Sequence, residues 1–255
     1  MFFTDASYVG IDPTAGHKPF AYATLDVELR LTALGHGSLD EVLAFTAGQQ
    51  QAMVAVCAPR RPSQGLMERS EVRDSLNPQP RPGRWMNFRL VEYLLRQHGI
   101  GCYKSPQDEK ACPNWMQMGF HLYRRLEQMG YQPYPTEETA MQWLEVYPHA
   151  CYCTLLGHVP LPKNTLEGRL QRQLVLYKQK IGIPDPMDFI KGITSQHLLQ
   201  GSLTQNALYT QGELDALVAA YTAWQVANHP KQSTTLGDAS EGLVVLPVAE
   251  LKRHY

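Results

Sequence analysis

The pattern of apolar and polar residues in the first part of the chain predicts a sheet that begins with antiparallel strands. An apolar run over residues 8–11 ends at Asp12 and Pro13, and a second run covers residues 20–25 after a short Gly-containing turn. Over residues 27–33 apolar and polar side chains alternate, as they do in a strand with one face in water. Three strands joined by short turns predict an antiparallel meander.

A helix and a fully buried strand are expected next. Ser38 and Glu41 have the spacing of a capping box, and the apolar residues that follow predict a helix that runs toward Gln50. Residues 53–57 are apolar without alternation, which is typical of a strand that is buried on both faces. Such strands usually have parallel neighbours in a sheet that is covered by helices.

The rest of the chain mixes helical and extended patterns. Residues 59–82 are rich in Pro, Arg and polar side chains and predict an irregular excursion. Helical spacing of apolar residues recurs in three middle segments and in a long late segment, and two short apolar runs predict further strands. The expected helices cover residues 88–96, 115–129, 165–180 and a segment that begins near residue 212, and the expected strands cover residues 143–147 and 242–246.

Composition favours a soluble globular protein, with 44% hydrophobic and 18% charged residues. No apolar run approaches the roughly 20 residues that span a bilayer, and the amino terminus lacks a secretion signal, so we expect no membrane association and a cytoplasmic location. Five cysteines without scaffold-like spacing agree with a reducing compartment. The net charge of -1 predicts no general attraction to nucleic acid, although basic residues gather over residues 60–104 and 163–180. Those basic residues fit either a phosphate-binding groove or solvated helix faces.

Three acidic residues are candidates for chemistry. Asp12 ends the first strand, and the proline after it holds it in extended geometry. Glu145 lies in a short strand that ends before Pro148, and Asp215 lies near the start of the late helix. Each has an ordinary alternative, which is a turn residue for Asp12, an outward-facing strand residue for Glu145 and a partner of the helix dipole for Asp215.

The order of these elements resembles the ribonuclease H-like fold, an α/β fold with a five-stranded mixed sheet and helices on both faces, here with helical insertions in one domain over residues 1–255. More narrowly, six short segments resemble a family of predicted nucleases that is called domain of unknown function 429. They follow the family's order over nearly the whole chain. The segments are VGID (9–12), MVAVCAP (53–59), FRLVE (88–92), EVYP (145–148), LDALVAA (214–220) and EGLVVLP (241–247).

The resemblance implies metal-dependent hydrolysis of phosphodiester bonds in nucleic acid. Two Mg²⁺ or Mn²⁺ ions would need hard oxygen ligands from separate elements, and Asp12, Glu145 and Asp215 are the residues that the resemblance assigns to catalysis and metal binding. Arg89 and Arg60 are the expected substrate-binding residues.

Two departures from the family pattern bear on activity. The family usually has Asp at the position of Cys57, and thiolates suit Zn²⁺ better than Mg²⁺. Gln211-Gly212-Glu213 stands where paired acids often precede the late helix. A weakened, differently metallated or inactive site is therefore an open alternative.

The sequence also leaves functions other than a nuclease open. A noncatalytic module that keeps the fold and binds nucleic acid or a protein is the main alternative. A zinc site is conceivable because Cys and His residues occur near one another, but none has the two-residue spacing of a zinc knuckle. A phosphotransferase would need a Gly-rich phosphate loop, which the sequence lacks. The Cys and His residues considered for the zinc site are Cys151, Cys153, His149 and His158, and separately Cys102, Cys112 and His98.

The sequence predicts no oligomeric state.

Overall fold

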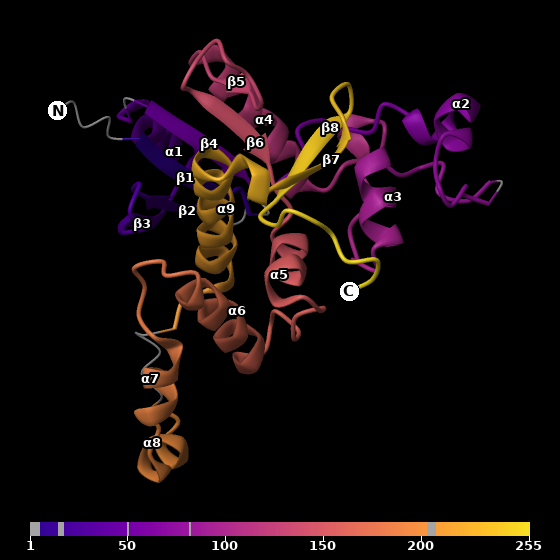
Figure 1. The fold of residues 1–255 in the computed structure, drawn as a ribbon. Coiled ribbons are helices and arrows are strands. Elements are labelled where there is room, and N and C mark those ends of the chain that lie inside the picture. Colours follow the sequence, from indigo (N-terminus) through magenta and orange to yellow (C-terminus); the bar gives the residue numbers. More distant parts are fainter. Residues whose placement is uncertain (1–5, 15–17, 50, 82, 203–207) are drawn as a thin grey trace.

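A computed structural model describes residues 6–14, 18–49, 51–81, 83–202 and 208–255. The described chain has a mixed α/β architecture around one mixed sheet, as predicted (Figure 1). The order across the sheet is β3-β2-β1-β4-β6-β8-β7, and β5 pairs with β6 off this path. The strands are β1 (Ala6–Asp12), β2 (Phe20–Leu25), β3 (Leu31–Gly37), β4 (Gln51–Val56), β5 (Gln132–Pro133), β6 (Gln142–Glu145), β7 (Thr234–Asp238) and β8 (Gly242–Leu246).

Strand directions follow the predicted arrangement at the centre of the sheet. β1, β2 and β3 form an antiparallel meander, and β4 lies between β1 and β6 and is parallel to both. β8 continues the parallel set beyond β6, and β7 is antiparallel to β8. The carboxyl ends of β1, β4 and β6 therefore lie at one edge of the sheet, where ligands bind in open α/β sheets.

The sheet differs from the expectation in two respects. The described residues form eight strands instead of five, because the strand predicted over residues 242–246 joins the sheet as β8, and β5 and β7 were not apparent from the sequence. The third strand covers Leu31–Gly37 instead of residues 27–33. Asp26 accepts hydrogen bonds from the backbone N–H groups of Glu28 and Arg30, and this turn replaces the start of the expected strand. Most of the turn expected between β1 and β2, residues 15–17, lies outside the described residues.

The described residues include nine α-helices. The capping box of Ser38 and Glu41 begins the first of them, as predicted. The helix that begins at Pro148 was not predicted, because a proline that ends a strand can also occupy the first turn of a helix. Among these helices, none combines the length and apolarity needed to cross a membrane. They are α1 (Leu39–Ala47), α2 (Ser70–Asp74), α3 (Leu90–Gln97), α4 (Asn114–Gln128), α5 (Pro148–Leu156), α6 (Leu166–Lys178), α7 (Pro186–Lys191), α8 (Ser195–Gln200) and α9 (Gln211–Asn228).

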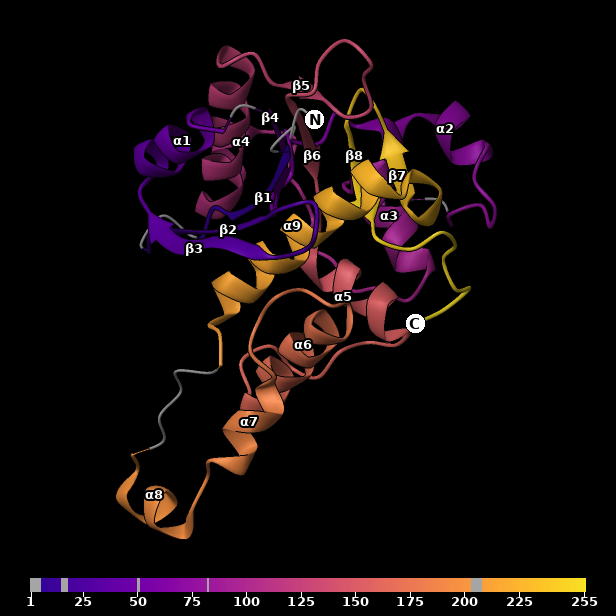
Figure 2. The ribbon, with the colours of Figure 1, turned by 60° about the vertical axis from the view of Figure 1, so that its left-hand side comes forward.

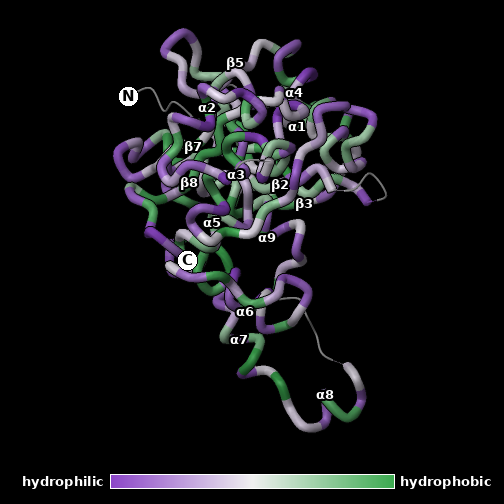
Figure 3. The backbone as a smooth tube through the Cα atoms, turned by 90° about the vertical axis from the view of Figure 1, so that its right-hand side faces the viewer, coloured by the Kyte–Doolittle hydropathy of each residue, from purple (hydrophilic) through white to green (hydrophobic). Residues whose placement is uncertain are grey.

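Helices cover both faces of the sheet (Figure 2). On one face, α1 and α4 pack over a cluster that includes Ile11, Val56 and Trp143. On the other face, α9, α5 and α6 pack over a larger cluster that includes Cys57 and Val146. Stretches of hydrophobic residues accordingly run through the centre of the molecule (Figure 3). The helices α7 and α8 form an arm that projects from it.

Helix α9 lies unusually close to β1, and this contact positions the candidate site. A Cβ atom on Gly10 would lie 1.9 Å from the carbonyl oxygen of Ala216 and 2.4 Å from the backbone nitrogen of Ala220. Glycine on the strand and small residues on the helix are therefore required for this distance. The result is that the amino-terminal turns of α9 lie beside the carboxyl end of β1.

Candidate active site

A cavity of about 860 Å³ opens at the carboxyl edge of the sheet, and two aspartates line it. Asp12 is the last residue of β1, and Asp215 lies in the second turn of α9. Both side chains are partly buried. The first turn of α9 reaches Asp12, since a Cβ atom on Gly212 would lie 3.5 Å from Asp12 Oδ2. The structure thus brings together two of the three acids that the sequence singled out.

Local contacts hold each aspartate. The backbone N–H of Thr14 donates to Asp12 Oδ1 at 3.3 Å, and the side-chain amide of Gln211 donates to Asp215 Oδ1 at 2.8 Å. The amino terminus of α9 is capped by Thr210 and Glu213 in a capping box. The ordinary alternative for Asp215 was a partner of the helix dipole, but the acid in the first turn of α9 is Glu213 and Asp215 lies one turn later, where the dipole interaction is weaker.

The ionised forms of both carboxyl groups are disfavoured in the free protein. Burial, followed by the proximity of Asp215, raises the pKa of Asp12 to about 7. Burial raises the pKa of Asp215 to about 6, although the Gln211 bond and the positive charges of Lys163 and Arg172 oppose this. Within the described part of the chain, neither aspartate has an ion-pair partner. Neighbouring acids with raised pKa values in a cavity are typical of functional sites.

Gln211 presents a second polar atom at this site. Its Nε2 faces Asp215, and a carboxylate can only accept, so the orientation of the amide is determined. The Oε1 atom is buried, and the described residues offer it no hydrogen-bond donor. A buried acceptor without a partner costs free energy, so a donor or a cation from a ligand would be favourable here.

Cys57 lies with Asp12 and Asp215 at this edge of the sheet. It follows β4, and its backbone N–H donates to Ile11 O at 2.9 Å, which places it beside Asp12. Burial, followed by the negative charges of Asp12 and Asp215, raises the pKa of its thiol well above the ordinary value. The thiol donates to the backbone carbonyl of Asp215 at 3.4 Å. Cys57 therefore stands as a neutral donor at the carboxyl end of β4.

Glu145 lies on the opposite face of the sheet from Asp12. In the parallel register Glu145 pairs with Val56, and Val56 pairs with Ile11, so the three side chains point the same way. Ile11 and Val56 belong to the cluster beneath α1 and α4. Because side chains alternate along a strand, Asp12 and Cys57 point to the α9 face. The structure does not bring Glu145 to the cavity that Asp12 and Asp215 line.

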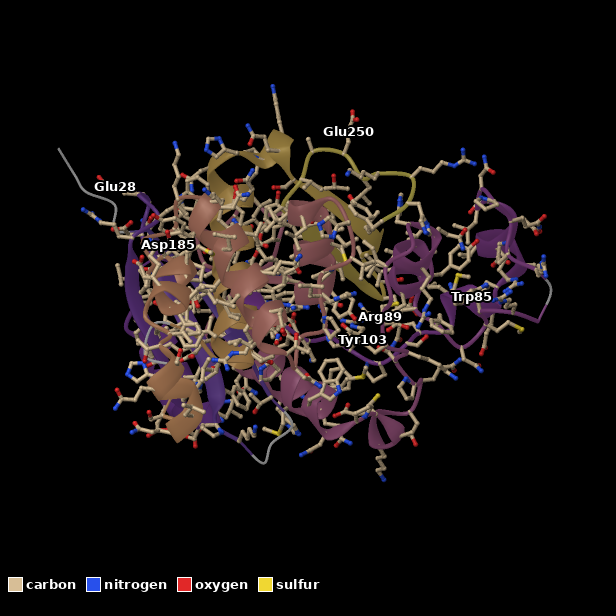
Figure 4. The ribbon with its side chains drawn as sticks, turned by 90° about the horizontal axis from the view of Figure 1, so that it is seen from below. Glu28, Trp85, Arg89, Tyr103, Asp185 and Glu250 are labelled. Carbon is tan, nitrogen blue, oxygen red and sulfur yellow. The ribbon has the colours of Figure 1, made fainter. Side chains whose placement is uncertain are left out.

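Both oxygens of Glu145 are engaged by Arg89. The guanidinium donates to Oε1 at 2.7 Å and to Oε2 at 2.9 Å, and the backbone N–H of Arg60 adds a bond of 3.0 Å to Oε2. Arg89 is fully buried and lies next to Tyr103 (Figure 4). Its side chain, which was expected to bind substrate, has no exposed surface and does not line the cavity.

The amino acid sequence matches the family model described as "Protein of unknown function (DUF429)" over residues 10–240. The chain belongs to this family. No curated protein and no solved structure matched the chain. The match begins in β1 and ends between β7 and β8, so the part of this DUF429 protein that lines the cavity falls inside it.

The DUF429 chain carries a buried polar network that sequence reasoning missed. Beyond Glu145, Arg89 donates to the backbone carbonyl of Glu241 at 3.0 Å, and the Glu241 carboxylate accepts from the backbone N–H of Leu90 at 2.7 Å. A Cβ atom on Gly242 would lie 1.9 Å from Arg89 Nη2, which explains the glycine after Glu241. The landmark segments around residues 88–92, 145–148 and 241–247 are thereby linked by one structural network.

Arg60 also lies outside the main cavity of the DUF429 protein. Its guanidinium is 4.8 Å from the ring centroid of Trp143 and 3.5 Å from Glu127. It borders a separate cavity of about 140 Å³ together with Arg61 and Arg124.

A cysteine–histidine zinc site receives no support from the positions of these residues. All five cysteines are free and buried. Across the residues that the structure describes, no group of three or more His, Cys, Asp or Glu side chains is arranged to hold a metal ion. Cys153 lies 3.7 Å from His149, one turn earlier on α5, as is usual for residues four apart in a helix.

The remaining cavity wall of the DUF429 protein contains aromatic rings and Lys18, which the sequence did not single out, and two cations from the basic segment over residues 163–180. Lys163 and Lys18 are exposed, and Arg172 is buried and donates to Leu161 O at 2.9 Å. Such residues come from separate loops and helices, and only the tertiary fold assembles them. The aromatic residues that line the cavity are Tyr103, Trp115 and Tyr147.

Proposed function

We propose that this DUF429 protein is a metal-dependent nuclease that hydrolyses phosphodiester bonds at the cavity lined by Asp12 and Asp215. The observation that carries the proposal is the pair of partly buried carboxyl groups, which lie close together, have raised pKa values and lack an ion-pair partner among the described residues. Such an arrangement costs stability in the free protein and is relieved when a cation binds.

The donor set fits one Mg²⁺ or Mn²⁺ ion. Mg²⁺ is commonly held by one or two carboxylates together with water and substrate phosphates. Asp12 and Asp215 supply two carboxylates, and the unpartnered Oε1 of Gln211 is a further hard oxygen at the same place. The resemblance implies two ions, but Glu145 is bound by Arg89 and Cys57 supplies no anion. We therefore propose a site for one ion.

We also propose that the fold is ribonuclease H-like. The strand order β3-β2-β1-β4-β6, with three antiparallel strands followed by parallel ones, supports this assignment. So does the placement of one acid at the end of β1 and another on a late helix. The proposed fold is consistent with nuclease chemistry but does not establish it, because one fold can carry many functions.

The residues of the chain would divide the chemistry among them. A bound divalent cation supplies Lewis-acid stabilisation of the charge that develops on the phosphate. Lys163 and Arg172 add positive charge beside the substrate phosphate. His149 has a pKa lowered by burial and by the charges of Arg172 and Lys163, so at neutral pH it is uncharged and can accept a proton from water.

A noncatalytic binding module is the second candidate. It is favoured by Cys57, because a protonated thiol replaces the third acid of the family pattern. The substitution Cys57→Asp would add that acid, with Cys57→Ser as the control of similar size. If the natural protein binds no metal but Cys57→Asp does, the chain has lost a site that its fold can still form, and the binding module is preferred.

The deciding experiment measures metal binding and cleavage together. Calorimetric titration with Mn²⁺ and Mg²⁺ is carried out on the natural protein, the Asp12→Asn, Asp215→Asn double variant, Gln211→Leu and an exposed control, Asp40→Asn. Cleavage of single-stranded, duplex and branched nucleic acids is followed in parallel. We expect binding and cleavage to disappear in the double variant, to weaken in Gln211→Leu and to persist in the control.

Since substrate phosphates can complete a magnesium site, the titration is repeated with an uncleavable phosphorothioate oligonucleotide present. Absence of metal binding by the natural protein in both titrations would contradict the metal-dependent nuclease. Cleavage that survives in the double variant would contradict the assignment of the site.

A further inference from the structure

Three aromatic rings form one wall of the cavity that contains Asp12 and Asp215. This aromatic wall consists of Tyr103, Trp115 and Tyr147, which come from the loop after α3, the first turn of α4 and the segment after β6. The ring centroids of Tyr103 and Trp115 are 4.8 Å apart and those of Tyr103 and Tyr147 are 5.0 Å apart, both with edge-to-face geometry.

The aromatic wall is held in place by its surroundings. The hydroxyl of Tyr147 donates to the backbone carbonyl of Gly101 at 2.9 Å. Tyr103 lies against the buried pair of Glu145 and Arg89, and burial followed by the Glu145 charge raises its pKa well above the ordinary value. Trp115 keeps part of its surface exposed in the cavity. Rings whose positions are fixed lose little entropy when a flat ligand stacks on them.

Positive and negative groups share the same cavity with the aromatic wall. Lys163 and Arg172 line it, and their charges reach the aspartates, since both oppose the rise in the pKa of Asp215. A ligand in this cavity therefore meets aromatic rings, cations and the proposed metal-binding acids. Aromatic rings beside cations are the combination with which proteins bind unpaired nucleotides, because bases stack on the rings and phosphates meet the cations.

We infer that the substrate is a single-stranded nucleic acid, one of whose bases enters the cavity and stacks on Trp115. This inference rests on the proposed nuclease function and specifies its substrate class. A base inside a duplex is stacked between its neighbours and cannot present its face to the aromatic wall. An unpaired base has a free face, and a cavity of about 860 Å³ is in the range that takes ligands of this size.

Binding can be tested apart from cleavage. The Asp12→Asn, Asp215→Asn double variant serves as the binding protein, so that bound strands stay intact. Fluorescence anisotropy with a labelled twelve-nucleotide strand, as DNA and as RNA, is compared with the same sequence as a blunt duplex. We expect the strand to bind at least about tenfold more tightly than the duplex.

The role of Trp115 is tested in the same background. Trp115→Ala should weaken strand binding about tenfold or more, whereas Trp115→Phe, which keeps a ring, should stay within about threefold. Trp85→Ala is the matched control, because Trp85 packs on Phe88 and Tyr93 and does not line the cavity. Thermal unfolding of each variant shows whether a loss of binding reflects loss of the fold.

Equal affinity for strand and duplex, or equal effects of Trp115→Ala and Trp85→Ala, would overturn the inference. So would competition by a mononucleotide at the same concentration as the strand, since the ligand would then be a free nucleotide. If strand binding depends on Trp115 but the natural protein never cleaves nucleic acid, single-strand binding at the cavity is supported and the nuclease proposal is contradicted. If the natural protein cleaves duplex and Trp115→Ala does not change this cleavage, the nuclease proposal is supported and the inference about the substrate is contradicted.

Discussion

At the scale of single residues, the chemistry of this protein depends on what surrounds each acid. Asp12 and Glu145 both end short strands, yet the first has no ion-pair partner among the described residues and the second is bound by Arg89. Burial raises the pKa of Asp12, whereas Arg89 satisfies both oxygens of Glu145. The same type of residue is therefore a candidate ligand in one place and a structural anchor in the other.

The raised pKa of Asp12 predicts a pH-dependent cost to stability. Its pKa is about 7 in the folded protein and 3.8 in the ordinary state. Between these values the folded state holds more protons than the unfolded state, so the free energy of unfolding falls as pH rises. The substitution Asp12→Asn removes the ionisable group and therefore this fall in the free energy of unfolding. We expect the variant to be more stable than the natural protein by about 1–2 kcal/mol at about pH 8 and nearly equal to it below about pH 4.

Urea unfolding at several pH values measures this difference, with Asp40→Asn as an exposed control that should not change it. Mn²⁺ added at about pH 8 should stabilise the natural protein and leave Asp12→Asn unchanged. A variant that is less stable than the natural protein at every pH would show that Asp12 is a structural residue.

At the scale of elements, the packing of α9 on β1 places one acid beside the other. Asp12 and Asp215 are far apart in sequence, and their proximity depends on Gly10 facing the backbone of α9. The small residues of α9 that allow this contact are Ala216, Ala219 and Ala220, all of which are fully buried.

Substitution of Gly10 by Ala should therefore disturb both stability and the site. The new methyl group would lie 1.9 Å from a backbone carbonyl, so α9 must shift. We expect a loss of at least about 3 kcal/mol in the free energy of unfolding, together with weaker metal binding. Gly101→Ala is the control, because a Cβ atom there meets nothing within 4 Å. Denaturant unfolding that gives Gly10→Ala the midpoint of the natural protein would refute the close contact.

At the scale of the whole molecule, the polar network around Arg89 joins distant parts of the chain. It links the start of α3, the end of β6 and the turn between β7 and β8. Glu92 adds a further buried carboxyl, which accepts from the hydroxyl and backbone N–H of Ser105, and burial raises its pKa to about 7. Tyr103 lines the cavity and lies close enough to this network for the charge of Glu145 to contribute to its raised pKa.

Breaking this network should cost stability more than metal binding. Glu145→Gln leaves the buried Arg89 without its carboxylate partner, and we expect a loss of about 3–5 kcal/mol. Replacing both residues, with Arg89→Met and Glu145→Leu, should cost less than the single change, because no buried charge is left unpaired. Urea unfolding and Mn²⁺ titration of each variant provide the test. A Glu145→Gln variant that keeps full stability but loses metal binding would restore Glu145 as a ligand.

Local sequence patterns were enough to predict most elements. Alternation and apolar runs identified β1, β2, β4, β6 and β8, and the helix predicted from Ser38 and Glu41 is present with its capping box. These features depend on neighbours within a few residues, which the sequence displays directly. Membership in the DUF429 family also follows from the sequence, because it is a match of residues in order.

Tertiary structure decided which of the predicted residues meet. Alternation along β6 shows that Glu145 and Val146 face opposite ways, but the face that each takes depends on the register with β4 and β1. The partner of Glu145, the aromatic wall and the cations of the cavity come from segments that are distant in sequence. Contacts of this kind leave no periodic signal, so only the folded chain determines that Asp12 lies with Asp215 and that Glu145 lies with Arg89.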